Sequence, residues 1–279
     1  MQLGIFAKTF RRPDPGTTLE AVRAIGLRCV QFNFECAGLA SMPEEVPAAI
    51  LAAIASASHD TGVRLAALSG TFNMAHPDRE RRERGLLRLG VVAEAAAKLG
   101  IPLVTLCTGT RDREDMWRAH PDNRSGQAWS DLLESMERAL AIAGTAGVAL
   151  AIEPEHTNVV SDASRARALL DAMQAGDQLQ IILDPANLLQ KDRNQTDILA
   201  EAFALLGADL GLAHAKDRRH DGKVCALGRG VVDFDAYFTG LRSAGFHGPV
   251  IMHGFGESEA AESTAFARAK LQERPGEAG

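Results

Sequence analysis

The sequence lacks the features that mark several classes of protein. It has only four cysteines, Cys29, Cys36, Cys107 and Cys225, and none of them forms a Cys-x-x-Cys pair. Scattered cysteines argue against a disulfide framework and a cysteine-rich zinc site, and they favour reduced thiols in a cytoplasmic protein. No apolar run reaches the roughly 18 residues of a membrane span. The N-terminal segment MQLGIFAKTFRR has too short an apolar part for a signal peptide. We therefore expect a cytoplasmic protein without a membrane partner.

The charge balance also excludes some partners. The chain has 36 acidic and 30 basic residues, which gives a formal net charge of -6 at pH 7. A net negative protein does not attract a phosphate backbone over its whole surface, so no nucleic-acid partner is expected. With 279 residues and 46% hydrophobic content, the chain is long enough to bury a large core.

Eight short apolar runs alternate with longer stretches of helical spacing. Before Gly100, for example, Leu89, Val92 and Ala96 fall on one helical face. The first run is followed by Ala-Lys-Thr-Phe-Arg and not by a glycine-rich phosphate loop, which disfavours a doubly wound nucleotide-binding sheet. The pattern predicts a single (β/α)8 TIM barrel over residues 1–279, with 272–279 as a frayed tail. The eight runs are 3–6, 29–34, 63–68, 103–107, 148–152, 179–183, 210–213 and 250–252.

Four successive runs end in a residue that can bind a metal ion. These residues are Glu153, Asp184, His214 and His253. Active sites of such barrels lie at the carboxyl ends of the strands. Because side chains alternate along a strand, these four residues share their facing with apolar positions two residues earlier, and they can all point into the barrel. A single such residue is more often a cap or a structural histidine, but four in order indicate a site.

The donor set of this site indicates which ion it would hold. Two carboxylates and two imidazoles suit Mn, Zn, Co or Fe better than Mg, which favours oxygen ligands. One divalent metal ion is therefore the expected cofactor, held by Glu153, Asp184, His214 and His253. Without that ion the two carboxylates would repel each other, so removal of Asp184 is expected to leave the stability of the metal-free protein unchanged or raised.

Several motifs resemble those of a known family. They are Ile-Glu-Pro at 152–154, Leu-Asp-Pro-Ala-Asn at 183–187, His-Ala-Lys-Asp at 214–217 and GRGVVDF at 228–234. With these motifs the chain resembles, over nearly its whole length, the xylose isomerase-like barrel superfamily. That superfamily includes sugar phosphate isomerases/epimerases, ketose 3-epimerases, inosose dehydratases and endonuclease IV.

The resemblance implies roles for the same residues. In the ketose epimerases the metal is held by Glu, Asp, His and Glu, and the two glutamates also act as the acid/base pair. Glu153, Asp184 and His214 match the first three ligands, while His253 stands where the second Glu is expected. Glu153 and His253 are accordingly the candidate catalytic residues. Asn187 stands where the epimerases often have a substrate-binding His.

Other residues near the strand ends are candidates for binding substrate. Lys216 shares the facing of His214 and could hold an oxyanion or a phosphate, or it could be a surface lysine paired with Asp217. His156 lies in the loop after the fifth run, where a mobile loop residue is the alternative. Asn33 and Asn73 could bond sugar hydroxyls, although Asn is also common in loops for conformational reasons.

The sequence also predicts the roles of two segments outside the strand ends. The charged run Asp-Arg-Glu-Arg-Arg-Glu-Arg at 78–84 is expected to be a solvated first helical turn. The long segment 109–127 contains Trp117, which is expected to cover the pocket or to pack on a partner, so a homodimer stays open.

The function expected from these observations is that of a metal-dependent isomerase or epimerase, or a related dehydratase. Its substrate would be a small sugar, sugar phosphate or polyol ketone, and the reaction would remove a proton next to a carbonyl. One alternative is an endonuclease IV-like phosphodiesterase, which needs a multi-zinc cluster with many more histidines than the eight present. The other alternative is a non-catalytic sugar-binding barrel.

Overall fold

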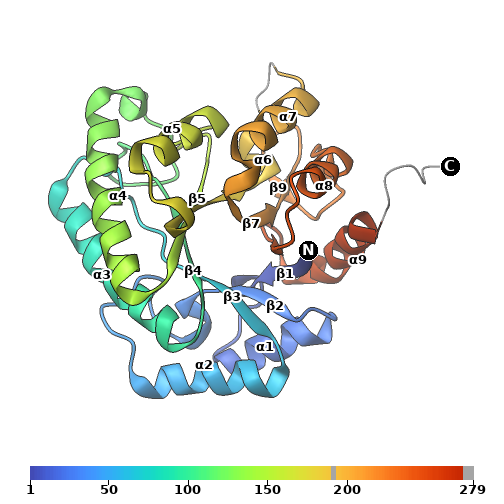
Figure 1. The fold of residues 1–279 in the computed structure, drawn as a ribbon. Helices are drawn as coiled ribbons and strands as arrows, with labels where there is room; N and C mark the ends of the chain where they lie inside the picture. The colour runs from blue at the N-terminus through green and yellow to red at the C-terminus, as the bar shows by residue number, and fades with distance from the viewer. Residues whose placement is uncertain (190–192, 273–279) are drawn as a thin grey trace.

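The computed structural model describes residues 1–189 and 193–272. Eight parallel strands close into a barrel in the order β1-β10-β7-β6-β5-β4-β3-β2, and helices surround it (Figure 1). The predicted (β/α)8 barrel is confirmed. The predicted frayed tail lies outside the described residues, apart from Gln272, which ends the last helix.

The eight expected runs all become barrel strands: 103–107 and 179–183 match at both ends, and the other six have ends shifted by one or two residues. The barrel strands are β1 Gln2–Phe6, β2 Cys29–Phe32, β3 Arg64–Ser69, β4 Leu103–Cys107, β5 Ala149–Glu153, β6 Leu179–Leu183, β7 Leu210–Ala215 and β10 Pro249–Met252. The short strands β8 Asp217–Arg218 and β9 Val224–Cys225 form a separate antiparallel pair. The helices are α1 Pro15–Ala24, α2 Ala48–Thr61, α3 Arg79–Lys98, α4 Gly126–Ala146, α5 Ala163–Met173, α6 Pro185–Leu188, α7 Gln195–Leu206, α8 Phe234–Ser243 and α9 Ala260–Gln272.

The barrel has its own interior core, distinct from the layer between strands and helices. Ala151, Ile182, Leu212 and Ile251 belong to one small buried cluster. Each of these residues lies two positions before one of the four candidate ligands. Side chains two apart on a strand face the same way, so the predicted inward facing of the ligands is confirmed. The larger apolar core packs the helices on the outside of the barrel.

Local sequence signals set the helix ends. The Asp78 carboxylate caps α3 by accepting from the N–H of Glu80 at 2.8 Å, and Gly147 ends α4 in the left-handed conformation. Gly207, which ends α7, has φ -56° and is not in the left-handed conformation. The charged run at 78–84 is not fully solvated, because Arg82 is 5% exposed and lies 3.0 Å from Glu134. The run begins α3 as expected, and Arg82 is its one buried residue.

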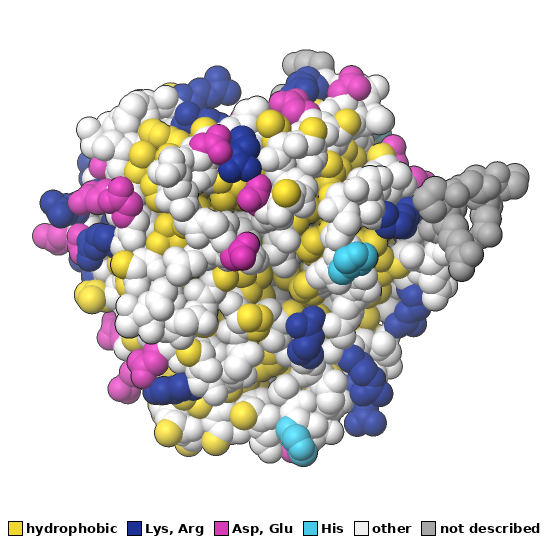
Figure 2. All heavy atoms as spheres, in the orientation of Figure 1, with side chains coloured by type: hydrophobic (Ala, Val, Ile, Leu, Met, Phe, Trp, Pro, Cys, Tyr) yellow, Lys and Arg dark blue, Asp and Glu magenta, His cyan; other side chains and the backbone are white. Residues whose placement is uncertain are grey.

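Long-range polar contacts join the first and last parts of the barrel. Arg12, after β1, forms an ion pair with Glu257, after β10, and the Arg268 side chain of α9 donates to the carbonyl of Gly26 at 3.1 Å. The surface carries both signs of charge, and Figure 2 shows acidic and basic side chains close together on the left and upper parts of this face. Over residues 1–189 and 193–272, none of the helices has the length and apolar character needed to cross a membrane.

Candidate metal centre and active site

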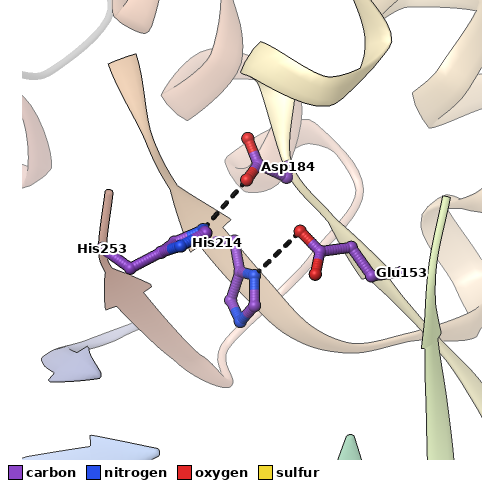
Figure 3. A group of neighbouring side chains, drawn as sticks. All are labelled: Glu153, Asp184, His214 and His253. Carbon is purple, nitrogen blue, oxygen red and sulfur yellow. Dashed lines mark hydrogen bonds and ion pairs between the residues drawn. The ribbon is translucent and has the colours of Figure 1, made fainter. Parts of the chain in front are cut away.

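Four side chains meet at the carboxyl-terminal rim of the barrel. Glu153 is the last residue of β5, Asp184 follows β6, His214 is the penultimate residue of β7 and His253 follows β10. Each offers one ligand atom, and these atoms all lie within 4.8 Å of one another. Figure 3 shows the side chains pointing toward one another from their neighbouring strands. Within the described ranges this is the single group of this kind.

The four side chains are arranged as two contacting pairs. Nδ1 of His214 lies 3.1 Å from Oε1 of Glu153, and Nε2 of His253 lies 3.0 Å from Oδ2 of Asp184 (Figure 3). The two imidazole rings lie beside each other with centroids 4.5 Å apart. Asp184 is 1% exposed and Glu153 9% exposed, so both carboxylates are largely removed from water. Two buried carboxylates require compensating charge.

Gln31 of β2 fixes the orientation of His214. Its Oε1 lies 2.8 Å from Nε2 of His214, while its Nε2 donates to the hydroxyl of Thr105 at 3.1 Å. His214 therefore faces acceptor oxygens at both ring nitrogens, and a neutral imidazole has only one N–H. If Nε2–H donates to Gln31, the lone pair of Nδ1 faces the carboxylate of Glu153. A cation shared by these two atoms satisfies both of them, so the donor set fits a metal ion.

Lys216 brings a positive charge into the cluster. Its Nζ lies 3.3 Å from Oδ2 of Asp184 and 3.9 Å from Oε2 of Glu155, and it also donates to Oδ1 of Asn187. Burial lowers the pKa of Lys216, but Asp184, Glu153 and Glu155 outweigh this and raise the pKa above its ordinary value. Lys216 is thus an ammonium at neutral pH. The alternative of a surface pair with Asp217 is not what the structure shows.

The carboxylates respond to these neighbours. Burial raises the pKa of Asp184, yet Lys216 and His253 oppose it more strongly, and the pKa falls well below its usual range. Burial likewise raises the pKa of Glu153, but the charge and hydrogen bond of His214 bring the pKa below its usual value. Both groups are therefore ionised at neutral pH. The expected repulsion between the two carboxylates is present, because Asp184 raises the pKa of Glu153, but the cationic and donor groups around them outweigh it.

For His253, in contrast to the two carboxylates, the effect of burial on the pKa prevails over that of the neighbouring charges. Burial lowers its pKa, and the nearby His214 lowers it further, against the raising effect of Asp184. The pKa of His253 thus lies below the ordinary value of 6.5. The imidazole of His253 is neutral at neutral pH and can bind a metal ion or accept a proton.

A cavity of about 400 Å³ opens onto this cluster. Glu153, His214 and His253 lie at one side of it. Such a volume falls within the roughly 300–1,000 Å³ typical of small-molecule sites. The remaining walls combine polar groups with apolar side chains: Phe6, Lys8, Gln31, Asn33, Ser41, Ser69, Thr71, Thr105, Leu106, Cys107, Met116 and Trp117.

The loop after β4 brings Trp117 to this cavity. The side-chain oxygens of Asn73 and Asn123 accept from the backbone N–H groups of Thr110 and Arg111, at 3.0 and 2.8 Å. The Arg111 guanidinium pairs with Asp131 of α4 at 2.5 Å. These contacts anchor the loop, and Trp117 lines the cavity while 51% exposed. The expected role of Trp117 as a cover for the pocket agrees with this position.

The predicted substrate-binding residues take different places. Asn33 lines the cavity, with its amide nitrogen donating to Ser41 at 2.7 Å. Asn187 is buried and donates to Oε1 of Glu153 at 2.8 Å, so it orients a ligand side chain. Asn73 bonds the backbone of Thr110 through both side-chain ends. His156 lies outside the 400 Å³ cavity, where its Nδ1 is 2.7 Å from Glu155.

Two sequence motifs serve to build the site. Asp217 is fully buried and accepts from the N–H groups of Arg218, Gly228, Gly230 and Val232. The Gly-Arg-Gly-Val-Val motif is thereby folded back onto the end of β7. Tyr237 of α8 places its hydroxyl 2.9 Å from the carbonyl oxygen of Leu183 and 2.8 Å from that of His214. These contacts hold the ends of β6 and β7, where two of the candidate ligands lie.

Gln31 was missed by the sequence analysis, although a signal was present. Cys29, two residues earlier on β2, belongs to the interior cluster, so Gln31 and Asn33 share its inward facing. The same alternation that located the four ligands would have located this amide. Glu155 lies in the loop after β5, and nothing in its spacing predicts its contact with Lys216.

The parallel barrel, with its ligand-capable side chains at the carboxyl ends of the strands, defines the class of the protein. A family model described as xylose isomerase-like TIM barrel matches residues 19–273, and the chain belongs to this family. A search of curated proteins finds no match.

Solved structures show the same fold. A 3-keto-D-glucoside 4-epimerase from E. coli is 18% identical, with a TM-score of 0.76 and coverage of 96% of this chain and 99% of that one. A D-psicose 3-epimerase from Clostridium cellulolyticum H10 is 17% identical, with a TM-score of 0.76 and coverage of 97% and 99%. An IolI protein with a bound zinc atom is 17% identical, with a TM-score of 0.75 and coverage of 97% and 98%.

Proposed function

We propose that the protein is a divalent-metal-dependent isomerase or epimerase, or a related dehydratase, acting on a small sugar, sugar phosphate or polyol ketone. The observation that carries this proposal is the cluster of four ligand-capable side chains beside a 400 Å³ cavity at the barrel mouth. Membership of the family and the likeness to two sugar epimerases and a zinc-binding protein support it.

Glu153, Asp184, His214 and His253 would hold the ion. Together with Glu155 and Lys216 their formal charge is -2, since three carboxylates oppose one ammonium, and a divalent ion balances it. When bound, such an ion supplies Lewis-acid polarisation of a carbonyl or hydroxyl oxygen. Nitrogen-rich ligation favours Mn, Zn, Co or Fe over Mg.

Glu153 and His253 would carry out the proton transfer, and other side chains would position them and the substrate. Glu153 is ionised and lines the cavity, so it can take a proton from a carbon next to a carbonyl. His253 is neutral and lines the same cavity, so it can receive a proton or return one. Asn187 orients Glu153 by donating a hydrogen bond to its Oε1. Asn33 and Lys8 face the cavity and can bond hydroxyl groups, while Met116 and Trp117 limit the access of water.

A screen of ketoses and inososes with Mn-loaded protein in deuterated water tests this proposal. We expect deuterium to enter the carbon next to the carbonyl of at least one sugar, together with turnover. Glu153→Gln should lower kcat by about 10²–10⁴, the usual contribution of a positioned acid or base. Glu94→Gln is the matched control, because Glu94 is exposed on α3 and pairs with Lys98. Absence of exchange and turnover across the panel would contradict the proposal.

His253→Glu separates the two roles open to His253. If His253 is a ligand, the variant rebuilds the two-glutamate set, binds Mg or Mn at least as well as the parent and gains any epimerase activity that the parent lacks. If His253 acts only as a base, metal binding stays nearly constant while turnover collapses. No effect on either quantity would remove His253 from the site.

A further inference from the structure

A second cavity lies next to the metal centre and is rich in arginine. Its volume is about 710 Å³, and its described lining includes Arg193, Arg218 and Arg219, with the histidines His156 and His220. The acidic residue among the described lining is Asp221, whose carboxylate contacts its neighbour Lys223. Three guanidinium groups against one carboxylate make this cavity cationic, in a chain with a net charge of -6.

Two of these arginines keep their charge available. Arg218 is half-buried and donates through Nη2 to the carbonyl of Leu189 at 2.7 Å. Across the described residues, no carboxylate forms an ion pair with Arg218 or Arg219. Arg193, by contrast, pairs with Glu201 at 2.6 Å. A guanidinium held beside a cavity without a counter-ion is the side chain best suited to bind a phosphate or carboxylate through two parallel hydrogen bonds.

The segment that presents these arginines is fixed in place. Arg218 follows the buried Asp217, whose carboxylate accepts from three backbone N–H groups of residues 228–232 and so ties the two segments together. The backbone N–H of Arg219 donates to the carbonyl of Lys223 at 2.8 Å, which closes the β8–β9 hairpin. The guanidinium groups thus project from an ordered hairpin, and binding an anion there requires little ordering of the backbone.

A short chain of contacts links this cavity to the metal ligands. His156 lines the cavity and contacts Glu155, Glu155 lies 3.9 Å from Lys216, and Lys216 lies 3.3 Å from Asp184. The arginine-lined cavity is therefore three side-chain contacts away from Asp184 of the four-residue cluster.

We propose that this cavity is an anion subsite that binds the phosphate or carboxylate group of the substrate through Arg218 and Arg219. The inference rests on the proposed function and narrows it, because the natural substrate is then an anionic sugar derivative and not a neutral ketose.

Calorimetric titration of the metal-loaded protein with three probes tests the inference. D-arabinitol, D-arabinitol 5-phosphate and D-arabinonate share a carbon chain and lack a ketone, so binding is measured without turnover. We expect at least one anionic probe to bind about tenfold or more tightly than D-arabinitol, a difference of about 1.4 kcal/mol. Preference for the phosphate ester, or for the carboxylate, identifies which anion the subsite takes.

Variants assign the preference to the arginines. Arg218→Gln combined with Arg219→Gln should abolish it and leave the affinity for D-arabinitol unchanged. Arg229→Gln should retain the preference, because Arg229 is exposed and pairs with Glu262 outside this cavity. If the double variant does not fold, Arg219→Gln alone tests the same point at an exposed position, with an expected loss of about threefold or more. Equal binding of all three probes, or a preference that survives in the variants, would overturn the inference.

These experiments distinguish a failure of the anion subsite from a failure of the proposed function. Turnover of neutral ketoses without any preference for anionic probes would leave the proposed function standing and remove the subsite. An arginine-dependent preference without turnover of any ketose would do the reverse.

Discussion

The ammonium nitrogen of Lys216 lies 3.3 Å from Oδ2 of Asp184, inside the group of side chains suited to hold a metal ion. The same oxygen contacts His253 at 3.0 Å. Lys216 thus supplies part of the positive charge that two buried carboxylates require when no ion is bound. We therefore expect the stability of the metal-free protein and its affinity for metal to be coupled through this lysine.

Lys216→Met should destabilise the metal-free protein and strengthen its binding of metal. Removing one partner of a buried ion pair costs about 3–5 kcal/mol, because the remaining charge loses its compensation. The carboxylates then bind a divalent ion without a competing cation, and we expect at least tenfold higher affinity. Urea denaturation of chelator-treated protein and Mn titration measure the two effects. Lys98→Met, which removes an exposed pair with Glu94, is the control. Weaker metal binding in the Lys216 variant would contradict the coupling.

Asp184→Ala should lower the stability of the metal-free protein by about 3 kcal/mol or more. The change leaves Lys216 and His253 without their carboxylate and removes the acceptor for the N–H of Ala186, which lies 2.9 Å away. Denaturation in the presence of chelator measures the loss, beside Asp60→Ala at an exposed position. An unchanged or raised stability would restore the simple expectation of repulsion between Asp184 and Glu153.

Gln31→Leu should weaken metal binding by about 10–100-fold without contacting the ion. Outer partners that fix the orientation of a ligating histidine typically have effects of this size, and Gln31 is the partner of Nε2 of His214. Gln31→Glu keeps the acceptor and should retain affinity. Gln2→Leu is the control, since Gln2 bonds Arg64 near the start of its strand. Metal titration that gives equal affinities for the parent and Gln31→Leu would show that Gln31 does not orient His214.

The stability of the metal-free protein should be highest between about pH 6.5 and 9.0. The pKa of His253 is lowered from 6.5 by burial and by His214, so the unfolded chain binds more protons and stability falls as the pH drops below 6.5. The lowered pKa values of Asp184 and Glu153 add a further loss as the pH falls through their folded values. On the alkaline side, burial raises the pKa of the Cys36 and Cys107 thiols from 9.0, so stability falls as the pH rises above 9.0. The raised pKa of Lys216 adds stability that is lost as the pH rises further, through its folded value.

Urea midpoints of chelator-treated protein between pH 4 and 11 measure this profile. His253→Gln should flatten the segment just below pH 6.5 and leave the alkaline limb in place. A stability that rises on acidification from pH 6.5 to 5.5 would be inconsistent with the lowered pKa of His253.

The barrel and the four candidate ligands could be predicted because both follow from short-range patterns. Strand spacing gave the (β/α)8 order, and alternation on each strand gave the facing of Glu153 and His214. Lys216 and Asn187 could not be placed, because their contacts depend on how the loops after β6 and β7 fold back. Spacing alone cannot distinguish Lys216 beside Asp217 from Lys216 beside Asp184.

The same limit applies to side chains that join separate loops or helices. Asn73 was expected to face substrate, yet its amide joins two loops through Thr110, a pairing across 37 positions of sequence. Arg82 lies within a strongly charged run, and its burial depends on Asp131 and Glu134 of the next helix. Side chains that make such contacts are recognised only once the neighbouring elements are in place.

A metal titration of chelator-treated protein, with the bound ion counted per chain, tests the central claim most directly. The account predicts one tightly bound Mn or Zn ion per chain in the parent. His214→Ala and Asp184→Ala should each lose about 100-fold or more in affinity, because each removes a ligand from the four-residue cluster. Binding of no ion, or of an ion whose affinity is unchanged in both variants, would contradict the account.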